Sequence, residues 1–469
     1  MAGLISTLDV LSAPGLADQG HGTSRVEAIL TDAGVTNADG WISWASGEQA
    51  QGRLAEAAAG LRRALAIDPN SVPAKFALTS ILLDLGDLAG AAAVADDLAA
   101  NGPATLELAW IKARIAMASA AWDSAADILR TLLSDPGLNE LQAAEAHLSL
   151  GLAFGEMGDA PSAFAAAATG KALQRRHYAR QAAGRESEPH KLRRLTKWLD
   201  GAAESFRSPF PFEGKAPVAQ HVFLLGFPRS GTTLLEQLLA AHPQVRALEE
   251  EPLLAAAYEA FLADEAACAS LAELGEEEAA AWAEHYWRSA QARVPDVSGK
   301  LFVDKQPAGT LNLPVIARLF PRAKILFAIR DPRDVVLSCF RQPFQMNAMT
   351  FAFTDLLETA DCYDACMGFA ELARARLPLA WADVRHEDLI EDVEGELDKI
   401  LYYLELPAHG GMSDVAATAN ARPIRTPSAT QVRAGLNRRG LGRWRHYANM
   451  LEPVMPMLAP WAERFRYAD

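Results

Sequence analysis

The pattern of hydrophobic and polar positions divides the chain into two parts with different periods. From about Asp39 to Ala172 the sequence is rich in Ala and Leu, and apolar residues recur at the spacing of one helix face. After about residue 217, short apolar runs alternate with helical stretches; the runs cover residues 221–225, 301–303, 325–329 and 379–384. Short apolar strands separated by helices are typical of βαβ units. We therefore expect a multidomain protein, with an all-α N-terminal part and a C-terminal α/β domain built on a central parallel sheet.

A similar unit recurs through the helical part. It carries a small residue at positions 52, 86, 120 and 158, which are 34, 34 and 38 residues apart. A 34-residue period with small residues between two closely crossing helices resembles tetratricopeptide repeats. A generic Ala-rich helical bundle is the alternative that the pattern leaves open. Stacked repeats would present a concave surface for a peptide or an acceptor's carrier, or would mediate a homodimer.

Changes in composition set the boundaries that we expect. Residues 1–38 form an N-terminal segment and residues 39–172 form the helical repeats. Residues 173–217 hold many charges and then the turn-rich sequence Ser208-Pro-Phe-Pro-Phe-Glu-Gly214, which predicts a helical transition followed by a linker. The α/β domain then covers residues 218–469.

Charge is distributed unevenly along the chain. There are 44 Lys and Arg against 59 Asp and Glu, a net charge of −15, yet seven arginines and no acidic residue fall between Arg422 and Arg445. An acidic protein lacks the broad cationic face that nonspecific nucleic-acid binding needs, so we expect no nucleic-acid partner. A compact cationic stretch instead predicts a site for a small polyanion.

Cysteines and long apolar segments are scarce. The four cysteines have no metal-site spacing and the ten histidines are scattered, so we expect no metal and a reducing compartment. No run of about 18 apolar residues occurs. The first twelve residues also lack a basic segment before an apolar run. We therefore expect a cytoplasmic protein with neither an export signal nor a membrane anchor.

The first apolar run of the α/β part leads into a glycine-bounded turn. Residues 221–225 precede Gly226-Phe-Pro-Arg-Ser-Gly-Thr-Thr233, after which a helical pattern begins. A strand, a turn and a helix start in this order form a cradle of backbone N–H donors for phosphate. The two glycines have P-loop spacing, but Thr232 stands where a nucleotide triphosphatase has its lysine, and Arg229 lies inside the turn. The ligand should therefore carry a 5′ group other than a triphosphate.

This turn and several later motifs resemble the sulfotransferases that use 3′-phosphoadenylyl sulfate (PAPS). The residues Pro228-Arg-Ser-Gly-Thr-Thr-Leu234 are similar to the family's 5′-phosphosulfate loop, and the run from Phe320 to Ser338 is similar to its 3′-phosphate strand and helix. The stretch His242-Pro-Gln-Val-Arg246 to Glu251, and Asp304-Lys-Gln-Pro307, are most similar to protein-tyrosine sulfotransferases and their bacterial repeat-bearing relatives. The resemblance spans residues from about 217 to 467.

The resemblance implies two sets of donor-binding residues. The set for the 5′-phosphosulfate comprises Arg229, Ser230, Gly231, Thr232 and Thr233. The set for the 3′-phosphate comprises Arg330, Ser338, Arg438, Arg439 and Gly440. The last three resemble the Arg-Lys-Gly run of cytosolic sulfotransferases, although the distance to Trp444 is one residue shorter than in that pattern.

Sulfuryl transfer also needs a base and cations at the bond that breaks. The resemblance selects Glu250 as the base that takes the acceptor's proton, while the neighbouring Glu249 and Glu251 stay open as alternatives. It assigns Arg229 and Lys305 to the leaving oxygen, and Ser428 as a hydrogen-bond donor to that oxygen or to the sulfuryl group. Local or structural roles are expected for Arg333 with Asp334, as an ion pair, and for His242 and His386.

Together these features predict an enzyme, a PAPS-dependent sulfotransferase that releases adenosine 3′,5′-bisphosphate (PAP). The acceptor would be a hydroxyl, of a peptide tyrosine, a small molecule or a glycan. A P-loop kinase-like nucleotide-binding enzyme is an alternative, which Thr232 at the lysine position opposes. An interaction scaffold with an inactive domain is another, which the joint presence of the candidate residues opposes.

Overall fold

The computed structural model describes residues 37–50, 52–101, 105–206, 216–415, 418, 435–436 and 438–467. Its contacts divide the chain into two compact units, residues 1–166 and residues 167–469. The expected N-terminal segment therefore lies almost wholly outside the described residues, as do residues 207–215 of the expected linker. Within the described part, no helix is both long enough and apolar enough to cross a membrane.

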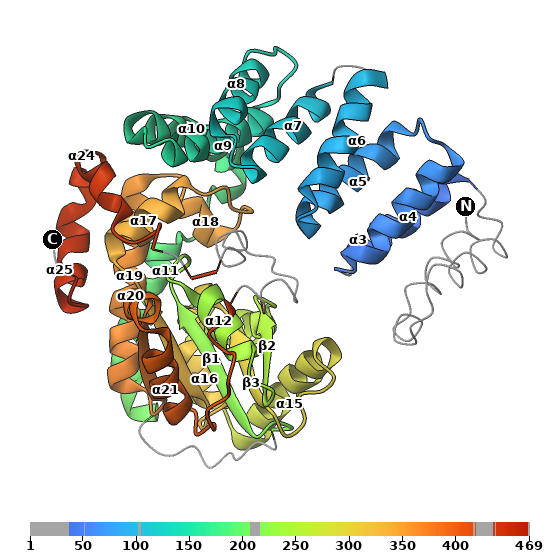
Figure 1. Cartoon of the computed structure of the whole chain (residues 1–469). Coiled ribbons are helices and arrows are strands. Elements are labelled where there is room, and N and C mark those ends of the chain that lie inside the picture. The colour runs from blue at the N-terminus through green and yellow to red at the C-terminus, as the bar shows by residue number, and fades with distance from the viewer. Residues whose placement is uncertain are drawn as a thin grey trace. The chain divides into compact units, whose positions relative to one another are not determined.

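The first unit is helical, as the sequence predicts. From α3 to α9, each helix contacts the next one along the chain. The helices are α3 (Ala38–Ala50), α4 (Leu54–Ile67), α5 (Val72–Leu85), α6 (Leu88–Asn101), α7 (Leu106–Ala118), α8 (Trp122–Leu133), α9 (Glu140–Glu156) and the start of α10 (Ala160–Ala182) (Figure 1). Several begin with a side-chain cap; Ser71, for example, accepts a hydrogen bond from the backbone N–H of Ala74 at the start of α5.

The small residues of the predicted repeat lie at the turns between helices. Gly52, Gly86, Ala120 and Gly158 have φ values of 78°, 80°, 56° and 83°. This left-handed backbone lacks a steric penalty only for glycine, which explains why three of the four positions carry it. The predicted small residue at each turn is therefore a backbone requirement.

The second unit is built on a parallel five-stranded sheet, which confirms the predicted α/β fold. Its strands are β1 (Gln220–Gly226), β2 (Val245–Glu249), β3 (Leu301–Lys305), β4 (Lys324–Ile329) and β5 (Ala380–Arg385), in the spatial order β2-β3-β1-β4-β5 (Figure 1). Every neighbouring pair is parallel, with Leu224 paired to Lys305 and Glu249 paired to the same lysine. The sequence pattern indicated four of these strands and missed β2.

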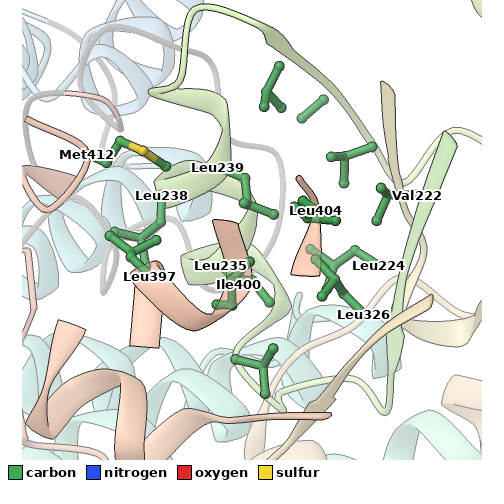
Figure 2. Packing of buried hydrophobic residues seen from close by; sticks show 14 of the residues in the cluster. Val222, Leu224, Leu235, Leu238, Leu239, Leu326, Leu397, Ile400, Leu404 and Met412 are labelled. Carbon is green, nitrogen blue, oxygen red and sulfur yellow. The ribbon is translucent and has the colours of Figure 1, made fainter. Parts of the chain in front are cut away.

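Two different cores cover the faces of this sheet. On one face, leucines of α12 (Thr232–Ala240) and α21 (Val393–Tyr403) pack on strand residues such as Val222 and Leu224 (Figure 2). The side chains of the alternate strand positions, such as Phe223 and Phe302, lie among aromatic rings that include Tyr286 of α15 (Glu276–Arg293). Because strand side chains alternate between faces, neighbouring residues of one strand enter different environments.

The helices between residues 167 and 202 belong to the second unit. Helix α11 (Glu188–Ala202) contacts α19 (Leu356–Arg376) and buries Leu192, Leu195 and Leu199. Ion pairs add to this contact, since Arg193 Nη1 lies 3.1 Å from Asp361 Oδ2 and Arg376 Nη2 lies 2.7 Å from Asp200 Oδ1. The segment expected as a helical transition thus packs against the α/β domain as far as it is described.

Shorter elements complete the second unit. They are η1 (Ala203–Phe206), α13 (Ala255–Phe261), α14 (Glu265–Ala272), η2 (Pro307–Asn312), α16 (Leu313–Leu319), α17 (Pro332–Arg341), α18 (Ala348–Ala352), α20 (His386–Glu391), η3 (Arg443–Tyr447), α24 (Ala448–Leu451), η4 (Glu452–Val454) and α25 (Met455–Arg464). Of these, α17 and η3 border the candidate site.

Candidate active site

All five strands end at one edge of the sheet, and the candidate residues lie there. β2 ends at Glu249, β3 at Lys305, β4 just before Arg330, and β5 just before His386. β1 runs into the loop 226–231. It lies between β3 and β4, so strands that follow β1 in the sequence lie on both sides of it in the sheet. The carboxyl ends of parallel strands form a ligand-binding crevice at such a switch point.

The loop 226–231 has a backbone that requires glycine at both ends. A Cβ on Gly226 would lie 2.8 Å from the carbonyl oxygen of Ala328. Gly231 has φ 95°, and a Cβ there would lie 2.4 Å from Nδ1 of His386. Between them, Arg229 also has a positive φ of 72°, which costs a residue with a side chain about 1–2 kcal/mol. The loop therefore holds a strained backbone conformation at Arg229, between two positions that require glycine.

Helix α12 begins directly after this loop. Ser230, Thr232 and Thr233 are 3%, 3% and 4% exposed, so these hydroxyl groups and the first N–H groups of the helix are largely withdrawn from water. The N-terminus of a helix presents unpaired N–H donors and the positive end of the helix dipole. This end of α12 is suited to an anion.

Arg229 and Arg330 connect the loop to the expected 3′-phosphate residues. Arg229 Nε donates a hydrogen bond to Ser338 Oγ at 2.9 Å. Arg330 donates through Nη1 to the carbonyl oxygen of Arg229 at 3.2 Å and through Nη2 to that of Gly440 at 2.6 Å. Burial, together with the charge of Arg330, lowers the pKa of Arg229 to about 10. Two buried guanidinium groups held this close repel each other, and an anion between them would relieve that repulsion.

Lys305 lies at the centre of a group of carboxylates. Its side chain is 0% exposed, and Nζ lies 2.8 Å from Glu250 Oε1, 3.2 Å from Glu249 Oε1 and 3.5 Å from Glu236 Oε2. Burial lowers the pKa of Lys305, but Glu236, Glu250 and Glu249 raise it by more, so the pKa is raised. The ammonium group therefore stays charged, and it neutralises only one of the three carboxylates around it.

The three consecutive glutamates after β2 differ in burial and in partner. The side chain of Glu249 is 13% exposed, that of Glu251 28% and that of Glu250 42%. Glu250 has a positive φ of 50°, and its N–H donates to the carbonyl oxygen of Lys305 at 2.9 Å. Glu251 turns to Arg293, whose Nε lies 2.8 Å from its Oε2. Glu250 is thus the glutamate closest to Lys305 and the most exposed of the three, as a group that meets an acceptor should be.

The C-terminal arginine run is described from Arg438 onward. Arg438 and Arg439 are exposed, and Gly440 lies against Arg330. Ser428, the expected hydrogen-bond donor, lies outside the described residues. The sequence predicts an ion pair between Arg333 and Asp334. In the structure, Arg333 Nη2 lies 2.9 Å from Asp331 Oδ2, while Asp334 accepts two backbone hydrogen bonds from the C-terminal run.

Comparison with protein families identifies this domain. Residues 221–410 match the model described as the sulfotransferase family, and residues 49–115 match a tetratricopeptide repeat. The C-terminal domain is thus similar to the sulfotransferase family over residues 221–410.

The proteins to which this chain is similar are distant. An uncharacterized protein of Aquifex aeolicus is 29% identical over 250 residues, which are 52% of this chain and 32% of that protein. Protein-tyrosine sulfotransferase 1 of Mus musculus is 32% identical over 150 residues, 30% of this chain and 38% of that protein. The chain thus spans about a third of the length of either protein. The sulfotransferase domain of the Synechococcus PCC 7002 olefin synthase aligns with a TM-score of 0.38 and 19% identity, over 54% of this chain and 97% of that one.

Two residues of the candidate site were not predicted from the sequence. Glu236 lies in the apolar run of α12, only 1% exposed, and contributes to the carboxylate group at Lys305. His386, expected to be structural, lies against Gly231 of the loop. Burial, with Arg330 and Arg229 nearby, holds the pKa of His386 well below its usual value, so this imidazole is neutral. By contrast, His242 has turn contacts, from Nε2 to the carbonyl oxygen of Pro407 and from Nδ1 to the N–H of Gln244.

The candidate site therefore combines a basic cradle with a cluster of carboxyl groups. The cradle comprises loop 226–231, Arg330, Ser338 and Gly440, and the carboxylate group surrounds Lys305. Within the described ranges, no three His, Cys, Asp or Glu side chains are arranged to hold a metal ion. The arrangement can bind a ligand with two anionic groups and can take a proton from a neighbouring hydroxyl.

Proposed function

We propose that this domain transfers the sulfuryl group of PAPS to an acceptor hydroxyl. The observation that carries the proposal is the hydrogen-bonded link from Arg229 to Ser338, at 2.9 Å, and from Arg330 to the loop carbonyl, at 3.2 Å. This link joins a 5′-phosphosulfate cradle and a 3′-phosphate site into one. A donor with phosphates on both sides of its ribose matches two adjoining cationic sites.

Features of the cradle support a fit to this donor. Arg330 Nε and His386 Nδ1 are buried and have no hydrogen-bond partner among the described residues. Buried polar atoms are almost always paired, so these two atoms are suited to contact a ligand. Gly440 keeps space beside Arg330, because a Cβ there would lie 2.9 Å from Nη2. An oxygen-rich anion seated here would accept from Arg330, and His386 would contact it after gaining a proton.

The chemistry is an in-line displacement at sulfur. The acceptor oxygen forms a new O–S bond while the bond from sulfur to the 5′-phosphate oxygen breaks, giving a sulfate ester and PAP. Glu250 takes the proton of the acceptor hydroxyl, and Lys305 and Arg229 stabilise the charge that grows on the leaving phosphate oxygen. The 2.8 Å contact between Lys305 Nζ and Glu250 Oε1 keeps base and cation together before the substrates bind. Ser428 is proposed as a further donor to the same oxygen.

For the acceptor we propose the hydroxyl of a peptide tyrosine. The similarity to protein-tyrosine sulfotransferase 1, at 32% identity over 150 residues, favours this acceptor over a small molecule or a glycan. The tetratricopeptide repeat match at residues 49–115 supports a peptide or protein partner on the first unit. Homodimerisation through the repeats and a cytoplasmic location remain predictions from the sequence.

The first experiment is a calorimetric titration with PAP in EDTA, with 5′-AMP and ATP·Mg²⁺ as comparisons. We expect metal-independent binding that needs the 3′-phosphate and that falls at least tenfold in Arg330→Ala, since a charged hydrogen bond contributes about 1.5–3 kcal/mol. Binding of ATP·Mg²⁺ without binding of PAP would refute the proposal and favour the kinase-like enzyme. Binding of PAP without transfer from labelled PAPS to any tyrosine, glycan or small-molecule acceptor would favour the inactive scaffold.

A further inference from the structure

The segment Gly440–Trp444 is fastened to the first turn of α17 at several points. Arg330 Nη2 donates to the carbonyl oxygen of Gly440 at 2.6 Å. The backbone N–H of Gly442 donates to Asp334 Oδ2 at 2.7 Å, and that of Trp444 donates to Asp334 Oδ1 at 2.8 Å. Beside them, the guanidinium carbon of Arg333 lies 3.9 Å from the centre of the Trp444 ring. The segment is therefore held through its backbone as well as through one aromatic side chain.

Asp334 accepts the two hydrogen bonds that hold the backbone N–H groups of this segment. Asp334 is only 3% exposed, and each of its carboxylate oxygens accepts a hydrogen bond from one backbone N–H of the segment. A charged acceptor strengthens such bonds roughly twofold over a neutral one. Because the bonds go to the main chain, they fix where residues 440–444 run, and with them where the preceding Arg438 and Arg439 begin.

We propose that Asp334 is a positioning residue that fastens segment Gly440–Trp444 beside Arg330 and so completes the 3′-phosphate site. The inference rests on the proposed function, because it assigns the site to a donor with a 3′-phosphate. Asp334 itself does not touch the donor; as an anion it would repel a phosphate, and both its oxygens are occupied by N–H groups. It acts through the segment that it holds.

This attachment is sensitive to acid. Burial raises the pKa of Asp334 to about 6, against the lowering effects of Arg330 and of the N–H groups of Trp444 and Gly442, while Asp331 adds to the rise. The opposing segment carries Arg443 and Arg445 on either side of Trp444. Protonation of the carboxyl below pH 6 removes one N–H acceptor and the charge that strengthens both bonds. Recognition of the 3′-phosphate should then weaken at acidic pH.

The test compares PAP with 5′-AMP, which lacks the 3′-phosphate, in wild-type protein and in Asp334→Asn. The asparagine keeps the shape but places an NH₂ group against a backbone N–H. We expect the ratio of the two dissociation constants to shrink by about tenfold or more, with the affinity for 5′-AMP nearly unchanged. A loss of general structure would weaken both ligands equally and would leave the ratio intact. An unchanged ratio in a folded Asp334→Asn protein would overturn the inference.

Asp364→Asn is the matched control. Asp364 of α19 also accepts an N–H from the C-terminal region, that of Trp461 Nε1 at 2.8 Å, but this bond holds α25 and not Gly440–Trp444. We expect the ratio of the dissociation constants for 5′-AMP and PAP in Asp364→Asn to equal that of the wild type. If Asp334→Asn fails to fold, Gly440→Ala decides, since its Cβ would lie 2.9 Å from Arg330 Nη2, so that the guanidinium group and the segment must separate with Asp334 intact. A wild-type ratio in Gly440→Ala would then contradict the inference.

A pH series completes the test and separates the two proposals. The 3′-phosphate itself titrates at about pH 6. The informative quantity is therefore the difference between wild type and Asp334→Asn in the ratio of the two dissociation constants. Between pH 7.5 and 5.5 the wild-type ratio should fall more steeply than that of the variant; parallel curves would refute the acid sensitivity. A wild-type protein that does not distinguish PAP from 5′-AMP at pH 7.5 would instead refute the proposed function.

Discussion

At the scale of single residues, Lys305 is the least replaceable group of the site. It is fully buried and faces Glu236, Glu249 and Glu250, so one positive charge is shared among three negative ones. Removing an ammonium from such a place would leave buried carboxylates without compensation, at a cost of several kcal/mol.

The glutamates after β2 give a direct test of the base. Glu250→Gln should lower the turnover of PAPS about 10²–10⁴-fold, the usual contribution of a general base, while the affinity for PAP stays unchanged. Glu251→Gln is the control, because this side chain pairs with Arg293 outside the carboxylate group. Turnover is measured by transfer of labelled sulfate from PAPS. Equal losses in both variants would mean that Glu250 is not the base.

One of the repeat turns carries alanine at a left-handed position where the other turns carry glycine. Ala120 has φ 56° where the equivalent positions are glycine, for example Gly86 with φ 80°. Ala120→Gly should therefore raise the free energy of unfolding by about 0.5–1 kcal/mol, since the left-handed strain at alanine is relieved. Gly86→Ala should lower it by a similar amount. Urea denaturation of the two variants gives both values, and a destabilised Ala120→Gly protein would contradict this account of the turns.

The sequence revealed some site residues because they belong to a local pattern. Arg229 and Arg330 each lie at the end of a strand-like run, and the structure brings them together. Glu236 could not be predicted, because a glutamate among leucines is equally consistent with an exposed position of a helix. Its burial is explained by Lys305, which lies at the end of strand β3, far along the chain. His386 was missed for a similar reason, since its neighbour Gly231 comes from a distant part of the chain.

At the scale of elements, the last two residues of strand β3 lie in different environments, on opposite faces of the sheet. Lys305 faces the carboxylate group, whereas Asp304 accepts a hydrogen bond from Tyr286 Oη at 2.8 Å, and this hydroxyl lies 2.8 Å from Nε2 of His221. The chain of polar groups is buried among aromatic rings. Burial raises the pKa of Asp304 to about 7, with the Tyr286 hydrogen bond opposing it, and burial lowers the pKa of His221 to about 3.

The raised pKa of Asp304 predicts how stability changes with pH. Between about pH 4 and pH 7 the folded carboxyl holds its proton while the unfolded one has lost it, so the folded state binds more protons and stability falls as pH rises. Three pKa units correspond to about 4 kcal/mol. Asp304→Asn removes this effect, and its stability relative to wild type should increase between pH 4 and pH 8. Urea denaturation across this range measures it; a constant difference would show that Asp304 is ionised throughout.

Elements differed in how well the sequence predicted them. Three of the predicted strands, β1, β3 and β4, are central in the sheet and appear as continuous apolar runs, because both faces of a central parallel strand are buried. The fourth, β5, lies at one edge of the sheet and was indicated by the run 379–384. β2 is an edge strand, and Arg246 and Glu249 interrupt its apolar character. Its place in the sheet depends on pairing with β3, from Val245 with Leu301 to Glu249 with Lys305. Such pairing between distant segments leaves little trace in local sequence.

At the scale of the whole molecule, the second unit extends further toward the N-terminus than its family match. The match begins at residue 221, whereas the compact unit begins at residue 167. Lys171 of α10 donates from Nζ to the carbonyl oxygen of Gln342 at 2.7 Å, next to the end of α17. Burial lowers the pKa of this lysine to about 8. The second half of α10 thus supports the helix that carries Ser338.

Truncation variants test this extended boundary. A protein that starts at residue 160 keeps α10 and α11, whereas one that starts at residue 218 exposes the surface of α19 that Leu192, Leu195 and Leu199 cover. Burial of each leucine contributes about 1.5–3 kcal/mol, so the shorter protein should lose on the order of 5 kcal/mol and melt at a much lower temperature. Thermal melting and PAP binding give the result. Equal melting temperatures would mean that residues 167–217 are dispensable.

The spacing of the repeat turns has a consequence for how the gene can change. Gly52, Gly86 and Ala120 are 34 residues apart, and the helices from α3 to α9 each contact the next. Recombination that removes or duplicates one unit of 34 residues would bring a left-handed turn position back into register with its successor. An array of this kind can therefore be lengthened or shortened during evolution in whole units, while the coding region of the catalytic unit stays untouched.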